Sequence, residues 1–136
     1  MGMRRQAREW ALQFLFQRDF HGENLPEDLA QFWEGKTPSP SAKSFTEQLV
    51  YGVERRRLEL DKLISSCADN WDIDRMGGVD RNVMRIAVHE MTSDGDVPAV
   101  VAIDEAVEIA KLYSSNESGR FVNGILDRAL SKLKQE

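Results

Sequence analysis

Residues 79–91 read VDRNVMRIAVHEM, the pattern of a helix that is apolar around most of its circumference. The apolar members are not confined to one stripe: they are Val83, Met84, Ile86, Ala87, Val88 and Met91. Because such a helix must be covered on several sides, we expect it at the centre of the core. The Gly77-Gly78 pair before it is not a phosphate-binding loop, because no GKS or GKT sequence follows it.

The segments on either side are also predicted to be helical, because their apolar residues recur at spacings of three and four. The expected helices cover residues 3–20, 26–33, 42 to about 64, 99–113 and the segment after 118. We expect a break or kink near Gly52 and the arginine triplet 55–57. Asp96 should cap the helix at 99–113, with Pro98 in its first turn. These patterns predict one all-α domain over residues 1–136.

The final helix has a core stripe made of Val122, Ile125, Leu126, Ala129 and Leu133. Gly124 lies in the middle of this helix, where glycine costs about 0.5–1 kcal/mol relative to alanine. We therefore expect another backbone to approach Gly124 closely.

The charge of the chain is distributed unevenly. The formal net charge is −5, so there is no global field that would attract RNA or DNA. Residues 1–21 have a balance of +2, which leaves −7 for the rest of the chain. A nucleic-acid site must therefore be local, and the basic N-terminal segment is the candidate.

The first helix has an apolar side that faces the core and a polar side. The core stripe consists of Ala7, Trp10, Ala11, Phe14 and Leu15. Arg4 and Arg8 lie together at one edge of this stripe, and Phe16 lies among polar residues on the opposite side. An aromatic ring among guanidinium and amide groups suits stacking on an unpaired base, although a solvated helix face would look the same.

The residues needed for catalysis or metal binding are missing. His21 and His89 have no histidine or cysteine at metal-ligand spacing, and Cys67 is the single cysteine. We therefore expect no enzyme activity, no metal and no cofactor. The single cysteine suits a reducing compartment, and no apolar run approaches the ~18 residues of a membrane span, so a cytoplasmic location is expected.

Four blocks of this sequence, in this order and spacing, resemble the NusB family of bacterial transcription antitermination factors. The blocks are RRQAREWALQFLF at 4–16, VMRIAVHEM at 83–91, DVP with AIDEAVEIAK between 96 and 111, and FVNGILD at 121–127. The resemblance covers almost the whole chain. It implies about seven helices in two packed helical bundles.

The resemblance also implies a function. Members of the family bind the boxA element of ribosomal RNA leader transcripts together with a ribosomal small-subunit protein, NusE, and the pair joins an antitermination complex on RNA polymerase. The RNA-binding positions of the family correspond to Arg4, Arg5, Arg8, Gln13, Arg120 and Phe121. Its partner-binding positions correspond to Phe16, Asp80 and Glu117. Phe16 is thus open to two interpretations, base stacking from the helix pattern and NusE contact from the resemblance.

Two alternatives to these interpretations remain. A helical adaptor that binds only protein would also fit the acidic net charge. The triplet Arg55-Arg56-Arg57 could contact RNA, but Glu54, Glu59 and Asp61 flank it, so ordinary surface ion pairing is the favoured interpretation.

Overall fold

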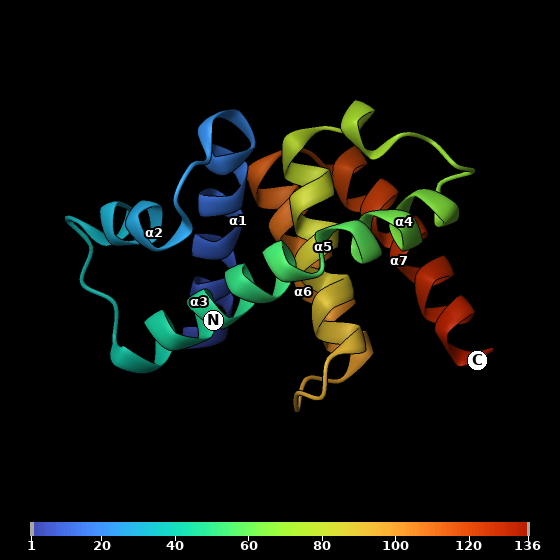
Figure 1. Cartoon of the computed structure of the whole chain (residues 1–136). Helices are drawn as coiled ribbons and strands as arrows, with labels where there is room; N and C mark the ends of the chain where they lie inside the picture. The colour runs from blue at the N-terminus through green and yellow to red at the C-terminus, as the bar shows by residue number, and fades with distance from the viewer. Residues whose placement is uncertain (1, 136) are drawn as a thin grey trace.

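The apolar stretch near the middle of the sequence forms helix α5, and the other helices of the computed structural model pack around it (Figure 1). The structure describes residues 2–135, so Met1 and Glu136, the two ends of the expected domain, lie outside the described residues. The described part contains seven α-helices, one 3₁₀ turn and no strand, which confirms the all-α prediction. The elements are α1 Met3–His21, α2 Leu25–Trp33, α3 Pro40–Arg55, α4 Arg57–Cys67, η1 Ile73–Arg75, α5 Gly78–Thr92, α6 Ala99–Tyr113 and α7 Asn116–Lys134.

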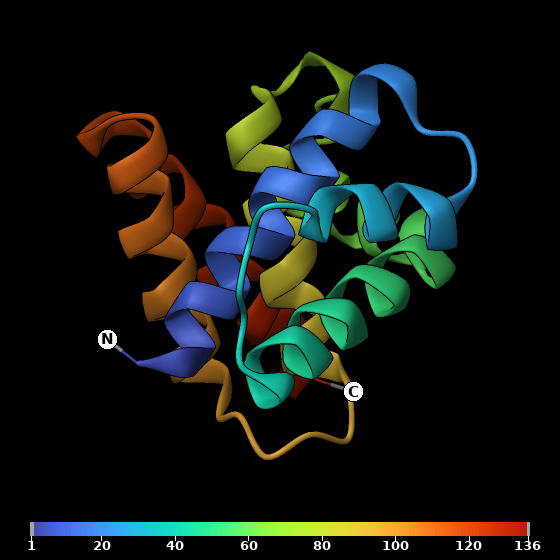
Figure 2. The same cartoon turned by 90° about the vertical axis from the view of Figure 1, so that its left-hand side faces the viewer.

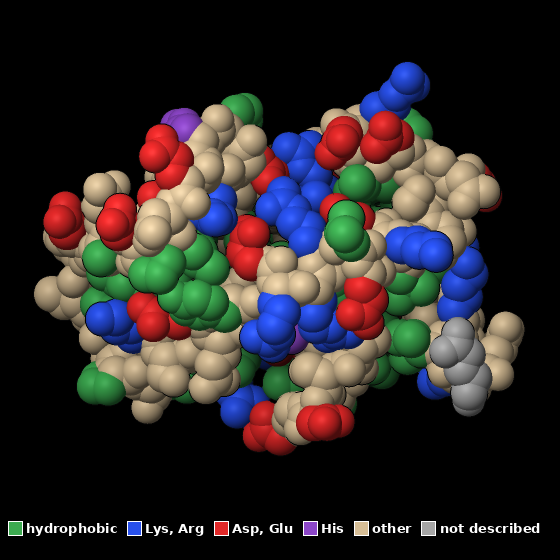
Figure 3. All heavy atoms as spheres, in the orientation of Figure 1, with side chains coloured by type: hydrophobic (Ala, Val, Ile, Leu, Met, Phe, Trp, Pro, Cys, Tyr) green, Lys and Arg blue, Asp and Glu red, His purple; other side chains and the backbone are tan. Residues whose placement is uncertain are grey.

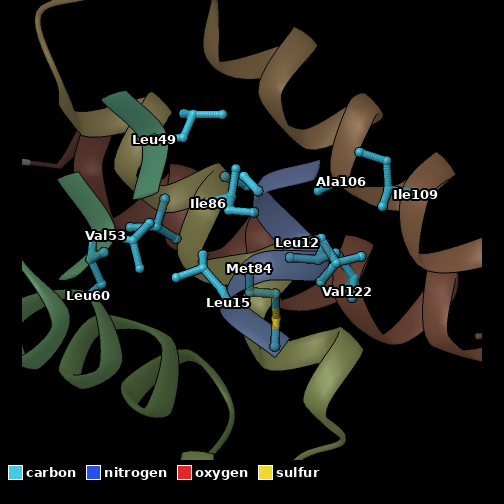
Figure 4. Packing of buried hydrophobic residues seen from close by; sticks show 14 of the residues in the cluster. Leu12, Leu15, Leu49, Val53, Leu60, Met84, Ile86, Ala106, Ile109 and Val122 are labelled. Carbon is cyan, nitrogen blue, oxygen red and sulfur yellow. The ribbon is translucent and has the colours of Figure 1, made fainter. Parts of the chain in front are cut away.

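Helix α5 has the central position that its sequence predicts. It packs against α1, α3, α4, α6 and α7. Val83, Met84 and Val88 are almost completely buried, and Figure 4 shows side chains of the surrounding helices converging on Met84 and Ile86. Burying a side chain of this size stabilises a fold by roughly 1.5–3 kcal/mol, so the contacts of α5 provide much of the driving force for folding.

The helices form two groups that share this centre. Helices α1, α2 and α3 lie on one side, α4, α6 and α7 lie on the other, and α5 contacts both groups (Figures 1 and 2). Buried hydrophobic residues from each of the seven helices form one continuous cluster. The expected arrangement of two packed bundles is therefore confirmed. No helix in residues 2–135 is long and apolar enough to cross a membrane.

The start of α6 differs from the prediction. Pro98 occupies the cap position of α6, and no side chain caps this helix. Asp96 does not reach the helix, because its carboxylate accepts a hydrogen bond of 3.2 Å from Arg4 of α1. Three other helices do have side-chain caps: the side chains of Asn24, Ser39 and Ser115 accept backbone N–H bonds at α2, α3 and α7.

The break between α3 and α4 is at Arg56, and Gly52 lies inside α3. A Cβ atom at Gly52 would overlap the imidazole ring of His89 on α5, so the glycine allows the two helices to cross closely. Arg56 holds the same ring from the other side, with its Nη1 atom 3.0 Å from Nδ1 of His89. The expected break near Gly52 and the arginine triplet is thus confirmed at Arg56, within the triplet, and Gly52 itself marks a helix crossing.

The sequence predicted that another backbone approaches Gly124 closely, and this prediction is wrong. The nearest atom to a Cβ built there is the Nη2 atom of Arg128 at 3.6 Å, which is an ordinary contact with an exposed side chain of the same helix. No neighbouring backbone lies within contact distance. The tight contact of α7 is at Gly119, where a Cβ would lie 2.7 Å from Cγ of Lys111 on α6.

Two arginines of the triplet pair with acids, as the favoured interpretation expects, whereas Arg55 has no carboxylate partner among residues 2–135. Arg56 binds Glu59 at 2.9 Å, and Arg57 binds Asp19 of α1 at 2.7 Å. Asp19 also accepts a hydrogen bond from Arg81 of α5 at 3.0 Å, so it joins α1, α4 and α5. Burial alone would raise the pKa of the Asp19 carboxyl, but a hydrogen bond from Asn82, the charge of Arg81 and the bond from Arg57 outweigh it, so this pKa is lowered.

Candidate nucleic-acid and partner interface

Three of the nine predicted site residues lie along the contact between α1 and α6, which run side by side in Figure 2. We call this contact the α1–α6 seam. It consists of Arg4, Arg5, Glu9 and Gln13 of α1 with Asp96, Glu105 and Tyr113.

Arg4 and Arg5 lie at the surface but are bound to carboxylates. Arg5 donates two hydrogen bonds to Glu105, from Nε at 2.6 Å and from Nη2 at 2.7 Å. Arg4 binds Asp96 and also lies over the ring of Phe45, 5.1 Å from its centroid. Hydrogen bonds from Arg5 lower the pKa of Glu105 against the opposing effect of burial. An anion that binds these guanidinium groups must share them with acids or displace the acids.

Arg8 does not lie at a solvated edge, which corrects the expectation from the sequence. Its side chain is 5% exposed and makes two bonds of 2.8 Å to Glu90 of α5, which is equally buried. A further contact of 3.4 Å reaches Glu105. Burial opposes the charged form of Arg8, but the hydrogen bonds and charge of Glu90 outweigh it, so the pKa of Arg8 is raised. Arg8 joins α1 to α5 and presents no free edge to RNA.

Gln13 is held in place by a tyrosine that was not among the predicted residues. Its Nε2 atom donates to the hydroxyl of Tyr113 at 2.8 Å, and that hydroxyl donates to Glu9 at 2.8 Å. Burial and the bond to Glu9 raise the pKa of Tyr113. Tyr113 is the last residue of α6, so this chain of bonds fixes the end of the seam nearest to α7. The only feature of the sequence that could have indicated a role for Tyr113 is its position as a polar aromatic residue at a helix end.

The three predicted partner residues come together beyond this end of the seam. Phe16 is 37% exposed, and its ring lies against the start of α5, because a Cβ at Gly78 would be 2.6 Å from Cε1 of Phe16. Asp80 lies two residues further along α5, near the side chain of Ser118 on α7. Glu117 precedes Ser118 and is exposed. The starts of α5 and α7 therefore place Phe16, Asp80 and Glu117 on one surface.

Asp80 has an unusual environment for a surface carboxylate. Its Oδ1 atom is buried and has no hydrogen-bond partner within residues 2–135. Burial raises the pKa of Asp80, and the nearby side chain of Ser118 offsets this only in part. The local electrostatics therefore disfavour the charged form of Asp80, whereas they favour the charged forms of Asp96 and Glu105.

Arg120 and Phe121 follow Glu117 on the same face of α7, at spacings of three and four residues. Arg120 is exposed. Phe121 is half-buried against Trp71, with ring centroids 5.9 Å apart and an interplanar angle of 85°. Trp71 is 44% exposed and was not among the predicted residues, because it lies in a connection with no helical pattern. Phe121 and Trp71 thus form an aromatic pair next to Arg120, a cation with no carboxylate partner among residues 2–135.

The predicted residues thus fall into three groups. Arg4, Arg5 and Gln13 lie along the seam. Phe16 lies near Asp80 and Glu117. Arg120 and Phe121 lie further along α7. Arg8 belongs to none of these groups. Within residues 2–135, no three His, Cys, Asp or Glu side chains are placed to hold a metal ion.

Comparison with known proteins establishes what this arrangement is related to. The model of the NusB family matches residues 5–131. The chain belongs to the NusB family. It is 41% identical to the transcription antitermination protein NusB of Sorangium cellulosum over 133 residues, which cover 98% of this chain and 95% of that protein.

Two solved structures extend the comparison to three dimensions. The structure of T. maritima NusB superposes with a TM-score of 0.84 and 39% identity, covering 93% of this chain and 89% of the other. A NusB chain in a structure of antitermination factors NusB and NusE with double-stranded RNA superposes with a TM-score of 0.86 and 30% identity. That match covers 97% of this chain and 98% of the other.

Proposed function

We propose that this protein is a transcription antitermination factor that binds the boxA element of ribosomal RNA leader transcripts together with the ribosomal small-subunit protein NusE. The pair would join an antitermination complex on RNA polymerase. The proposal is carried by the match of nearly the whole chain to a NusB protein in a complex with NusE and RNA. The expected single domain, residues 1–136, would act as one RNA-binding unit.

The surface suggests which residues contact RNA. Arg4 and Arg5 present guanidinium groups at the start of the seam, and Gln13 presents an amide further along it. Arg120 and Phe121 supply a cation and an aromatic ring on α7. Guanidinium groups bind phosphate, and aromatic rings stack on unpaired bases. We assign these five residues to RNA and exclude Arg8, because its hydrogen bonds to Glu90 hold it inside the protein.

Phe16, Asp80 and Glu117 are assigned to NusE. The ring of Phe16 lies against Gly78, which is two residues before Asp80 in α5. Phe16 is therefore grouped with the two acids rather than with the N-terminal arginines. An exposed ring beside two carboxylates is suited to a basic protein, because charge complementarity speeds encounter and selects the partner.

The proposal is tested by titrating fluorescently labelled boxA RNA with the protein, with and without NusE. We expect binding that is specific for boxA over a scrambled RNA and is tighter when NusE is present. Equal affinity for both RNAs under both conditions would contradict the proposal. Measurements at several salt concentrations are needed, since phosphate contacts dominate the salt dependence.

Arg5→Ala sharpens the RNA assignment. Loss of one phosphate contact should lower the slope of log affinity against log salt by about 0.7. Lys62→Ala is the matched control, because Lys62 is an exposed cation of α4 with no carboxylate partner among the described residues. An unchanged slope for Arg5→Ala would remove Arg5 from the RNA-binding set.

Charge reversal tests the partner surface. The double variant Asp80→Lys/Glu117→Lys should weaken NusE binding and the ternary complex much more than it changes the melting temperature. The competing explanation is that these acids only stabilise the positive ends of helix dipoles, worth roughly 0.3–1 kcal/mol each. Full NusE affinity in the folded double variant would place the interface elsewhere.

A second candidate function is a helical adaptor that binds NusE but not RNA. The observation in its favour is that the three arginines at the start of α1 are all bound to carboxylates. The same titration separates the two functions. An adaptor would retain NusE binding and show no specific affinity for boxA RNA in the presence of NusE.

A further inference from the structure

A groove leads away from Arg4 on the side of the molecule opposite to α6. It begins in a hollow of about 180 Å³ beside Arg4 and Phe45. It continues into a wider hollow of about 800 Å³ between α3 and the turn after α5. Gln48, His89, Ser93 and Gly95 line both hollows, so the two are continuous. Figure 2 shows the turn after α5 close to the start of α3.

The outer wall of the groove is one face of α3. Lys43, Glu47, Tyr51 and Arg55 follow one another at intervals of four residues and therefore lie along this face. At 1.5 Å per residue, Lys43 and Arg55 are separated by about 18 Å along the helix. Tyr51 lies between them and is 37% exposed. Two cations with an exposed aromatic ring between them match the way proteins bind single-stranded nucleic acid.

The charges in the groove differ from those of the seam. Lys43 and Arg55 are exposed, and neither has a carboxylate partner among the described residues, whereas Arg4 and Arg5 both have one. The carboxylate of Glu47 accepts a hydrogen bond of 2.8 Å from the indole of Trp33. In Figure 3, basic side chains gather near the middle of this face, with acidic side chains among them.

We infer that this groove is a second RNA-binding subsite, in which single-stranded RNA that flanks the boxA element runs from Arg4 along α3. Lys43 and Arg55 bind its phosphates, and Tyr51 stacks on a base. The inference rests on the proposed function, because it takes Arg4 to be an RNA contact. It adds to that function a path for the flanking nucleotides, which the seam and α7 do not provide.

The experiment compares a boxA RNA of minimal length with RNAs extended by unstructured nucleotides at the 5′ end or at the 3′ end, each in the presence of NusE. The variants are Tyr51→Ala and Lys43→Ala/Arg55→Ala. We expect the wild-type protein to bind one extended RNA at least several-fold more tightly than the minimal RNA. Tyr51→Ala should remove about fivefold or more of that gain, since stacking on an aromatic ring is lost. The double variant should lower the salt slope for that RNA by about 1.4, at roughly 0.7 for each phosphate.

Two controls separate the subsite from general effects. Tyr51→Phe keeps the ring and should retain the affinity for the extended RNA. Lys62→Ala/Lys134→Ala removes two exposed cations from α4 and α7, outside the groove, and should leave the gain intact. Circular dichroism of each variant confirms that it is folded, which is expected because the altered side chains are exposed.

The outcomes separate this inference from the function on which it rests. Normal binding of the minimal RNA, with no gain from either extension, would overturn the subsite alone. Equal losses for minimal and extended RNA in the groove variants would also overturn it, because the groove would then not be a separate site. Failure of the wild-type protein to bind any boxA RNA would overturn the proposed function and the subsite with it.

Discussion

Arginine and glycine residues have different roles on helix faces that pack against α5 and on helix faces that are exposed to solvent. Arg8 and Arg5 are three residues apart on α1, and each binds a carboxylate through two hydrogen bonds. The pair of Arg8 is buried against α5, whereas the pair of Arg5 is partly exposed at the seam. Gly52 and Gly124 differ in the same way, since only Gly52 is pressed against α5. We therefore expect substitutions of Arg8 and Gly52, which contact α5, to lower the free energy of unfolding more than substitutions of Arg5 and Gly124.

The largest effect is expected for Arg8→Ala. This change leaves the carboxylate of Glu90 buried without its partner, which typically costs about 3–5 kcal/mol. Urea denaturation should show a loss of this size in the free energy of unfolding. The double variant Arg8→Met/Glu90→Leu removes both charges and should recover most of the lost stability. A loss below 1 kcal/mol for Arg8→Ala would mean that the Arg8 pair resembles the exposed pair of Arg5.

Gly52→Ala should have the next largest effect. The added methyl group would overlap the ring of His89, which Arg56 holds on its other side, so the ring or the helix must shift. Overpacking of this kind costs typically 1–3 kcal/mol, and the better helix propensity of alanine offsets at most about 1 kcal/mol. We expect a lower melting temperature. An unchanged or higher value would show that α3 and α5 can separate at little cost.

Gly124→Ala should act in the opposite direction. A Cβ at this position meets only an exposed side chain at 3.6 Å, so the substitution gains helix propensity without a clash. The free energy of unfolding should rise by about 0.5–1 kcal/mol, measured by urea denaturation in parallel with Gly52→Ala. Destabilisation by Gly124→Ala would remove the contrast between the two glycines.

The smallest effect concerns the acid stability of the seam. Hydrogen bonds from Arg5 lower the pKa of Glu105 in the folded protein below its ordinary value. The contribution of this pair is therefore fully present above the unfolded pKa, near 4.5, and is lost as the pH falls through the folded pKa. Glu105→Gln should make stability less dependent on pH below about 4.5. Identical acid denaturation curves would show that the exposed pair contributes nothing to stability.

Much of the fold could be predicted because helical periodicity is a local property. The pattern of α5 showed both its helical nature and its central position, and the predicted helix at 99–113 has the same ends as α6. The errors and omissions arose where a residue's role depends on a distant neighbour. The partner of Arg8 is 82 residues away, and the neighbour of Gly52 is on another helix. A helix pattern cannot tell which part of a helix edge a second helix will cover.

The candidate site shows the same limit. Periodicity placed Phe16 away from the core, and it is indeed exposed, but only the structure brings its ring against the start of α5. Tyr113 and Trp71 were missed because their importance comes from contacts with Gln13 and Phe121 across helices. The assignment of individual residues to RNA or NusE remains a prediction.

The contact between Arg56 and His89 has a consequence for the position of a single hydrogen atom. A guanidinium group can only donate, so Nδ1 of His89 must accept, and the neutral ring carries its hydrogen on Nε2. Burial first, and then the charges of Arg56 and Arg55, lower the pKa of His89, which keeps this neutral tautomer at pH 7. Protonation would set a second donor against Arg56, so this crossing of α3 and α5 weakens as the pH falls below about 6.5. The nitrogen chemical shifts of the imidazole would report the tautomer directly.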